Sequence, residues 1–214
     1  FYVPTQEKEL NENLSIQGEK SIVLPLGETR ISRKVNDLTV IFRSCTRVNM
    51  VTQNKKRLFN KHKSEYTFRS LNSIIKSLNR AKLVLPKIKF DIILIDVNSE
   101  KNDIEQMKKQ LEKSNLKNSI ISLNVKEFSN NIKNINAKKE KVTENQISNM
   151  AGIHKSFLVA KDQCNDLVYF VEDDYVHQLD SIYEMIFTYE RISTQMNREL
   201  IICPTDYPYL YTKV

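Results

Sequence analysis

Short apolar runs alternate with amphipathic stretches along most of the chain. In the runs, several β-forming apolar residues follow one another, which is typical of strands covered on both faces. In the longer stretches, apolar residues recur every three or four positions, which is the spacing of one helix face. The runs that predict strands are 38–43, 90–96, 119–125, 167–171 and 200–203, and the stretches that predict helices are 64–82, 103–114, 146–163 and 179–195.

The order of these elements predicts an α/β fold. Strand and helix alternate from residue 38 onward, and parallel strands need crossover connections that are usually helical. We therefore predict a mainly parallel central sheet flanked by helices. Residues 1–37 are polar apart from one short apolar stretch and predict an N-terminal arm or extension, whereas 38–214 predict one domain. The Lys- and Asn-rich segment 126–145 predicts a loop or an irregular helix.

Composition narrows the class of protein. With 214 residues, 40% of them hydrophobic, the chain can bury a full core, and its lack of an initiator Met indicates a fragment. It has neither an apolar stretch of roughly 18 residues, as a bilayer span requires, nor the basic-then-apolar order of a signal peptide. Cys45, Cys164 and Cys203 are odd in number and widely separated, which favours buried free thiols. We expect a cytoplasmic protein, with the membrane surface as an alternative location.

The net charge of +7 favours acidic partners. A basic chain attracts nucleic acid, an acidic membrane surface or a phosphate-bearing small molecule. The densest basic patch, 55–63, is interpreted first as a solvated loop, because neither an RNA-binding aromatic signature nor a helix-turn-helix pattern accompanies it. We therefore expect no sequence-specific nucleic acid among the partners, and we keep peripheral membrane association as an alternative.

Three consecutive carboxylates follow the apolar run that ends at Val171. We expect the run to deliver Glu172, Asp173 and Asp174 to one point, where they repel one another unless a cation, water or hydrogen-bond donors compensate them. Mg²⁺ and Mn²⁺ take oxygen ligands of this kind, usually one or two carboxylates together with substrate phosphates. The triplet therefore predicts a divalent-metal site. The alternative is an acidic helix start with Asp174 as the cap.

Polar residues follow four of the predicted strands. In open α/β sheets, ligands bind beyond the carboxyl ends of the strands, where these residues would meet. They are Arg43, Ser44, Cys45, Thr46 and Arg47 after the first strand, Asp96, Asn98 and Ser99 after the second, Glu172, Asp173 and Asp174 after the fourth, and Thr205, Asp206 and Tyr207 after the last. Acids, arginines and hydroxyls at one edge predict a site for a nucleotide and a metal ion.

The order and spacing of three segments resemble the nucleotide-binding half of family 2 glycosyltransferases, which have the GT-A fold. The resemblance covers residues 38–211. It implies that Thr46 and Arg47 lie against the nucleotide and that Asp96 binds the base or the ribose. It also implies that Glu172 and Asp174 are the metal ligands of a DxD motif. The segments are Leu38-Thr39-Val40-Ile41-Phe42-Arg43-Ser44-Cys45-Thr46-Arg47, Ile92-Ile93-Leu94-Ile95-Asp96-Val97-Asn98-Ser99 and Tyr169-Phe170-Val171-Glu172-Asp173-Asp174.

Asn98, Asp173 and His154 complete the expected donor-binding residues. Family members usually carry an Arg-Asn pair on the helix before the DxD strand, whereas Ile153 and His154 stand there in this chain. His154 is therefore either a donor contact or a partly buried helix residue. The catalytic base of inverting members lies further along the chain, so we expect either Asp206 or a residue beyond the end of this sequence.

These expectations describe a metal-dependent glycosyltransferase of the hexosyltransferase type. It would move a sugar from a nucleotide-diphosphate donor, such as a UDP-sugar, to a saccharide or lipid-linked acceptor. Mn²⁺ or Mg²⁺ would neutralise the leaving diphosphate, and a carboxylate would deprotonate the acceptor hydroxyl. Two alternatives stay open. One is a nucleotidyltransferase, which the scattered Gly18, Gly27 and Gly152 disfavour because they form no phosphate loop. The other is a nucleotide-sugar-binding or polyanion-binding module without catalysis.

Overall fold

The chain consists of two compact units. The computed structural model describes residues 8–9, 22–23, 30–47, 61–128 and 141–204. One unit combines Phe1–Lys34 with Glu184–Val214, and the other is Val35–Tyr183. The second unit, here called the sheet unit, contains the central sheet and nearly all of the expected site residues. The domain boundary predicted between residues 37 and 38 stays a prediction.

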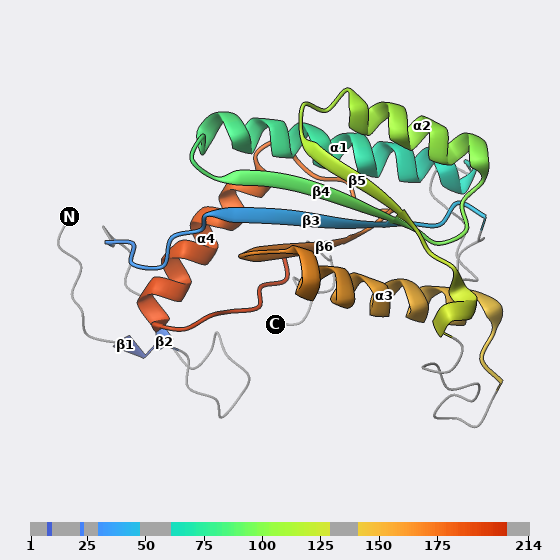
Figure 1. Cartoon of the computed structure of the whole chain (residues 1–214). Helices are drawn as coiled ribbons and strands as arrows, with labels where there is room; N and C mark the ends of the chain where they lie inside the picture. Colours follow the sequence, from blue (N-terminus) through green and yellow to red (C-terminus); the bar gives the residue numbers. More distant parts are fainter. Residues whose placement is uncertain (1–7, 10–21, 24–29, 48–60, 129–140, 205–214) are drawn as a thin grey trace. The chain divides into compact units, whose positions relative to one another are not determined.

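A four-stranded parallel sheet forms the centre of the sheet unit (Figure 1). Its strands are β3 (Asp37–Ser44), β4 (Lys89–Asp96), β5 (Lys117–Ser122) and β6 (Leu167–Glu172), in the spatial order β5-β4-β3-β6. Each strand pairs in parallel with its neighbour. The predicted α/β fold with a parallel central sheet is therefore confirmed.

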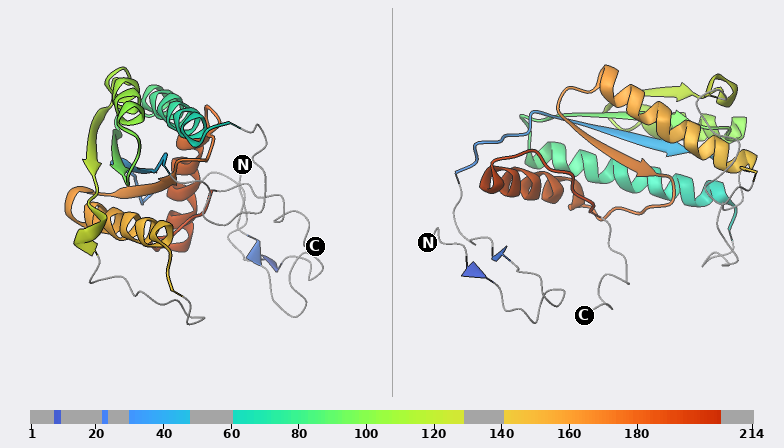
Figure 2. Two further views of the ribbon diagram at one scale, coloured as in Figure 1. Left: turned by 90° about the vertical axis from the view of Figure 1, so that its right-hand side faces the viewer. Right: turned by 90° about the horizontal axis from the view of Figure 1, so that it is seen from below.

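Helices cover both faces of this sheet, as the turned views show (Figure 2). Helices α1 (Lys63–Val84) and α2 (Lys101–Glu112) lie on one face. Helix α3 (Glu144–Gln163) and the short 3₁₀ helix η2 (Val125–Phe128) lie on the other. Among the described residues, no helix is long and apolar enough to cross a membrane.

Local sequence explains where the helices begin and which sides they bury. The apolar residues at helical spacing in the predicted helix 64–82 are all buried in α1: Phe68, Leu71, Ile74, Ile75 and Leu78. Helix α3 begins with a capping box, in which Thr143 and Gln146 satisfy each other's backbone N–H groups. Three- and four-residue apolar spacing is a local property, so both helices follow the predicted ranges closely.

The core of the sheet unit lies on both sides of β3 and β4. Val40 and Phe42 are fully buried on the α1 face, and Ile41 is fully buried on the α3 face. On the α3 side, Ile41, Ile93 and Ile95 form one cluster with Val97 and Val159. Burying each such aliphatic side chain stabilises the fold by about 1.5–3 kcal/mol. This packing makes the two central strands a rigid support for the residues at their ends.

In the unit that combines Phe1–Lys34 with Glu184–Val214, hydrogen bonds connect Arg33 to residues near the C-terminal end of the described chain. Helix α4 (Ser181–Met196) begins in the sheet unit and continues into this one. Arg33 Nε donates to Glu199 Oε1 at 2.7 Å, and its backbone N–H donates to Thr194 Oγ1 at 3.1 Å. The Tyr189 hydroxyl also donates to Glu199. In the same unit, β1 (Lys8–Glu9) and β2 (Ile22–Val23) form a short antiparallel pair.

Two strand predictions need correction. Residues 200–203 are not a strand, and Ile201 is fully exposed, because an apolar run becomes a strand only where a neighbour supplies its ladder hydrogen bonds. Ser119–Val125 was expected as a strand, but β5 ends at Ser122 and η2 begins at Val125. The expected segment 126–145 lies partly outside the described residues.

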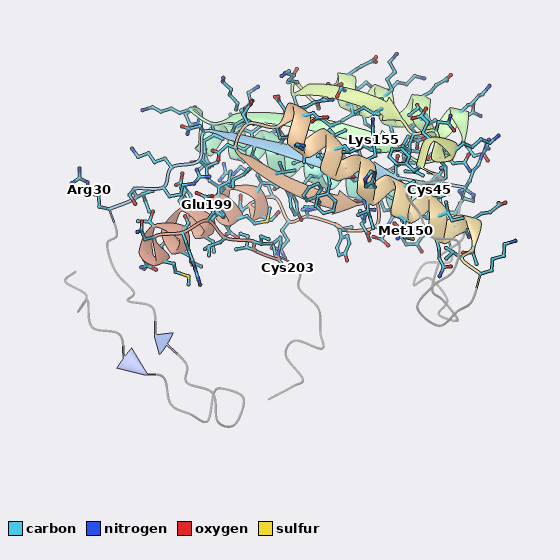
Figure 3. All side chains as sticks on the ribbon, turned by 60° about the horizontal axis from the view of Figure 1, so that its bottom comes forward. Arg30, Cys45, Met150, Lys155, Glu199 and Cys203 are labelled. Carbon is cyan, nitrogen blue, oxygen red and sulfur yellow. The ribbon has the colours of Figure 1, made fainter. Side chains whose placement is uncertain are left out.

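The cysteines form no disulfide, as expected. All three lie within the described residues, and Cys45 and Cys203 are labelled in Figure 3. Cys45 and Cys164 are partly buried, whereas Cys203 is exposed, so the expectation of three buried thiols is wrong for Cys203. Loss of hydration in its partly buried position raises the pKa of the Cys164 thiol.

Candidate functional site

The carboxyl ends of β3 and β6 form the topological switch point of the sheet. After β3 the chain builds β4 and β5 on one side, and it then returns to place β6 on the other side. In the parallel register, Phe42 lies opposite Val171 and Arg43 lies opposite Glu172. Open α/β sheets bind ligands just outside such a point. The charged residues here are called the switch-point cluster, and they are Arg43, Lys63, Glu172, Asp173 and Asp174.

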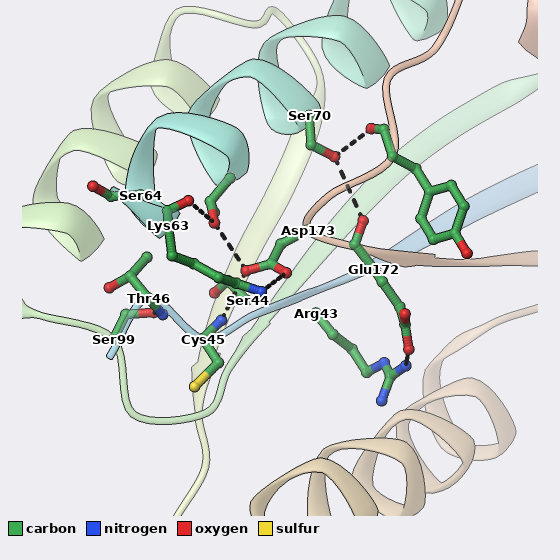
Figure 4. A network of polar contacts seen from close by, with 12 residues as sticks. Arg43, Ser44, Cys45, Thr46, Lys63, Ser64, Ser70, Ser99, Glu172 and Asp173 are labelled. Carbon is green, nitrogen blue, oxygen red and sulfur yellow. Dashed lines mark hydrogen bonds and ion pairs between the residues drawn. The ribbon is translucent and has the colours of Figure 1, made fainter. Parts of the chain in front are cut away.

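Two members of the acidic triplet, Glu172 and Asp173, lie on opposite faces of the sheet (Figure 4). Successive side chains of an extended segment point to opposite sides. Asp173 points to the same side as the buried Val171 and is 5% exposed. By contrast, half of the Glu172 side chain is accessible to solvent. The expectation that three carboxylates converge on one point is therefore wrong. Two different environments replace the single predicted site.

Asp173 is buried at the junction of β3, β6 and α1. Its Oδ1 accepts from Lys63 Nζ at 2.6 Å, and its Oδ2 accepts from Thr67 Oγ1 at 2.9 Å. The backbone N–H of Cys45 also donates to Oδ2, at 3.1 Å. A buried carboxylate needs such partners, and the N-terminus of α1 adds a partial positive charge. An Asp173 contact with a donor would require this network to open.

Glu172 lies on the α3 side and pairs with Arg43. Arg43 Nη2 donates to Glu172, and Arg43 Nη1 donates to Asn149 Oδ1 at 3.2 Å. Helix α3 approaches closely at Gly152, where a Cβ would lie 3.0 Å from Val97 Cγ2 and 3.9 Å from Arg43 Cδ. The missing side chain thus makes room for the stem of Arg43 beneath the helix.

Asp174 is exposed like Glu172, but within the described part of the chain its carboxylate has neither an ion pair nor a side-chain hydrogen bond. Loss of hydration among neighbouring atoms raises the pKa of its carboxyl. Lys63 opposes this rise in the pKa, while the negative charges of Asp173 and Glu172 add to it. A cation beside Asp174 would stabilise the charged carboxylate.

Hydroxyl groups on α1 hold the chain that follows β6. Ser70 Oγ donates to the carbonyl of Tyr175 at 2.6 Å. Ser73 Oγ accepts from the His177 backbone N–H at 2.9 Å, and Ser77 Oγ accepts from that of Ile182 at 3.1 Å. These hydroxyls recur every three or four residues along one helix face. They fix the loop that carries Asp174.

Asp96, expected to contact the base or the ribose, is 3% exposed. Its Oδ1 accepts from Ser44 Oγ at 2.9 Å, and its Oδ2 accepts from the Ser99 backbone N–H at 3.1 Å. Asp96 therefore joins the ends of β3 and β4 and shapes the turn after β4. In that turn, Asn98 has a φ of 75°, a left-handed conformation that Asn tolerates better than most residues.

Thr46 and Arg47 bind the turn after β4. The backbone N–H of Thr46 donates to Ser99 Oγ at 3.0 Å, and Thr46 Oγ1 accepts from the Glu100 backbone N–H at 3.0 Å. Arg47 Nε donates to Glu100 Oε1 at 2.8 Å, and its Nη1 donates to Asn98 Oδ1 at 3.2 Å. The carboxylate of Glu100 raises the pKa of Arg47. Arg47 and Glu100 are the solvent-accessible part of this group.

The two histidines near the predicted site have internal contacts. His154 packs edge-on against Phe128, with ring centroids 5.3 Å apart, and its buried Nδ1 has no hydrogen-bond partner among the described residues. His177 Nε2 lies 2.9 Å from the Tyr169 hydroxyl, and burial lowers its pKa to about 4. His177 is therefore neutral at physiological pH.

Only part of the acidic triplet could hold a metal ion. Among the described residues, no three His, Cys, Asp or Glu side chains come together in a group that could hold a metal ion. Asp174 fits a cation as a single carboxylate ligand, which suffices where substrate phosphates and water complete the shell. Glu172 and Asp173 each face a basic side chain instead.

The sequence did not indicate several residues of the site, and some residues that it did indicate lie outside the described part of the chain. Lys63 was assigned to a solvated basic patch, and Glu100 was not considered. Arg43 was only one polar residue among several. The signal that could have found Lys63 is its position at the start of α1, directly after β3 in the order of elements. Asp206, the expected base, lies outside the described residues, as do Thr205 and Tyr207.

Comparison with known proteins does not assign this chain to a family. No protein-family model matches the sequence, and no curated protein is significantly similar to it.

Proposed function

We propose that this protein is a glycosyltransferase that takes a sugar from a nucleotide-diphosphate donor. The observation that carries the proposal is the place of the switch-point cluster, which lies beyond the adjacent carboxyl ends of β3 and β6. This is where open parallel sheets bind nucleotides. The cluster combines basic groups that suit phosphate with an exposed carboxylate that suits a cation.

The basic members of the cluster support binding of a diphosphate. Lys63 is the first residue of α1, and the N-terminus of a helix favours an anion. Arg43 reaches the same edge from the α3 side of the sheet. A diphosphate beyond β3 and β6 would thus meet the guanidinium of Arg43 on one face and the positive end of the α1 dipole on the other. That charge would also stabilise the leaving diphosphate as the bond to the sugar breaks.

Asp174 supports a divalent cation shared with the diphosphate. Mn²⁺ or Mg²⁺ would be held by the Asp174 carboxylate together with donor phosphates and water. When bound, the ion supplies Lewis-acid neutralisation of the leaving group. Glu172 would become a second ligand only by leaving Arg43. Thr46 and Arg47, which follow β3 and contact the turn after β4, would lie beside the nucleoside part of the donor.

The acceptor half of the proposal rests on the sequence. Asp206 remains our prediction for the carboxylate that deprotonates the acceptor hydroxyl, and a saccharide or lipid-linked compound remains the predicted acceptor. A binding module without catalysis is the second candidate. It is favoured by one observation, namely that Asp96 and Asp173 are both occupied by internal hydrogen bonds.

Hydrolysis of nucleotide sugars tests the proposal without knowledge of the acceptor. A panel of UDP-, GDP- and dTDP-sugars is incubated with the protein in Mn²⁺ or in EDTA, and released nucleoside diphosphate is measured. We expect slow hydrolysis of at least one donor in Mn²⁺ that Asp174→Ala abolishes. Asp180→Ala, which alters an exposed carboxylate paired with Arg80, is the matched control and should keep the activity.

Calorimetric titration with UDP separates the two candidate functions. Binding of UDP without hydrolysis of any donor would favour the binding module. Neither binding nor hydrolysis would show that the nucleotide-sugar proposal is wrong.

A further inference from the structure

Arg43 lies at the switch point and has N–H groups beyond those that donate to Asn149 and Glu172. It directly follows the fully buried Phe42 on β3, and its side chain is 15% exposed. A guanidinium group has five N–H donors in a planar fork. The bonds to Asn149 and Glu172 use one N–H of each terminal nitrogen, so further donors remain at the edge of the sheet.

The position of Arg43 is set by its surroundings rather than by Glu172 alone. Gly152 lets α3 pass over the stem of Arg43, with the missing Cβ 3.9 Å from Cδ and 4.0 Å from Nη1. Asn149, one turn earlier on α3, accepts from Nη1 at 3.2 Å. These contacts would keep the guanidinium near the switch point after Glu172 left.

Glu172 is suited to exchange with an incoming anion. Its side chain is 50% exposed, and beyond Arg43 no side-chain partner of its carboxylate is found among the described residues. A carboxylate and a phosphate both accept charge-assisted hydrogen bonds from a guanidinium group, and Glu172 accepts only one such bond from Arg43. Phosphate could therefore replace Glu172 at small cost, because Glu172 would return to water.

Lys63 does not offer the same exchange. Its partner Asp173 is 7% exposed by side chain and has two further donors, Thr67 and the Cys45 backbone. Displacing Asp173 would leave a buried carboxylate without its cation, which is strongly unfavourable. An incoming anion can therefore separate the Arg43–Glu172 ion pair but not the Lys63–Asp173 ion pair.

We propose that Arg43 is the residue that binds the phosphate groups of the ligand, and that Glu172 is its counter-ion in the free protein rather than a metal ligand. The identity of the anion as a donor diphosphate rests on the proposed function. Binding of a phosphate anion by Arg43 does not depend on it.

Calorimetry with inorganic pyrophosphate in EDTA tests this assignment. Glu172→Gln removes the competing charge and should tighten pyrophosphate binding about fivefold, and loss of a metal ligand would instead weaken binding in Mn²⁺. Arg43→Gln should weaken binding at least about tenfold. Asn149→Ala should weaken it about fivefold, the equivalent of one hydrogen bond. Arg80→Gln removes an exposed arginine of the same sheet unit and should leave binding within about twofold.

The double variant and a conservative variant complete the design. Arg43→Gln/Glu172→Gln should bind as weakly as Arg43→Gln, because the gain from Glu172→Gln requires Arg43. Circular dichroism establishes that each variant is folded. If Arg43→Gln fails to fold, Arg43→Lys keeps the charge without the fork and should weaken binding about threefold.

Three results would overturn the inference: no binding of pyrophosphate by the wild-type protein, an unchanged affinity in folded Arg43 variants, or weaker binding by Glu172→Gln. The proposed function fails separately. If pyrophosphate follows the expected pattern but no nucleotide sugar is bound or hydrolysed, Arg43 binds a different phosphate compound. If nucleotide sugars are hydrolysed while the Arg43 variants bind pyrophosphate normally, the function stands and the Arg43 assignment is wrong.

Discussion

Asp173→Asn should destabilise the sheet unit by about 2–4 kcal/mol. The substitution keeps the size of the side chain and removes its charge, which leaves Lys63 without a counter-ion. The Lys63 and Asp173 side chains are 17% and 7% exposed, so water can replace the lost carboxylate only in part. Removing one partner of a buried pair costs roughly 3–5 kcal/mol. We take a lower figure because the Asn oxygen can still accept from Thr67 or from the Cys45 backbone.

The free energy of unfolding is measured by urea denaturation, followed by far-UV circular dichroism because the chain has no Trp. Asp180→Asn is the matched control. Asp180 also pairs with a basic residue of α1, namely Arg80 at 3.1 Å, but the two side chains are 45% and 44% exposed. An exposed pair contributes less than about 1 kcal/mol.

The coupling between the two charges gives a second test. Lys63→Met leaves Asp173 charged and buried, so it should destabilise the protein at least as much as Asp173→Asn. The double variant Lys63→Met/Asp173→Asn should recover part of the loss, because no unpaired charge remains. Equal effects of Asp173→Asn and Asp180→Asn, or strictly additive effects in the double variant, would refute a structural role. Loss of UDP binding at unchanged stability would instead support the donor contact predicted from sequence.

Three further changes test the packing and the titrating groups. Gly152→Ala should lose about 1 kcal/mol in urea denaturation, because the clash with Val97 outweighs the better helix propensity of Ala. Loss of hydration among neighbouring atoms raises the pKa of the exposed Asp174 above its ordinary 3.8, so its negative charge destabilises the native state as pH rises. Without metal, Asp174→Asn should therefore stabilise the protein slightly at pH 7 and not below pH 3.8. Burial lowers the pKa of His177 from 6.5 to about 4. The wild type should therefore lose about 3 kcal/mol of stability as pH falls through this window, and His177→Phe should remove that loss in pH-dependent denaturation.

The elements of the sheet unit could largely be predicted because their signals are local. The predicted helix 64–82 corresponds to α1, Lys63–Val84, and the predicted strand 90–96 corresponds to β4, Lys89–Asp96. On α1, apolar spacing reported which side of the helix is buried, whereas on α3 the apolar Met150 and Phe157 are exposed. The same reasoning failed at 200–203, where an apolar run is a strand only if a neighbour pairs with it.

The arrangement of the acidic triplet differs most from the sequence prediction, because its carboxylates do not meet at one point. The alternation of side chains along a strand already separates Glu172 from Asp173, so part of the correction was present in the sequence. The sequence did not show which basic residue pairs with each carboxylate. Arg43 meets Glu172 because β6 pairs with β3 in that register, and Lys63 meets Asp173 because α1 lies on that face.

The sequence by itself determined the alternation of strands and helices, the parallel sheet, and the edge at which polar residues gather. Only the tertiary structure decided which of these residues face solvent. Asp96 and Asp173 became internal, held by Ser44 and Lys63, while Asp174 stayed exposed on a loop fixed by α1 hydroxyls. The physical reason is that the energy of a charged group depends on its neighbours and its access to water. Both are set by contacts between residues far apart in the chain.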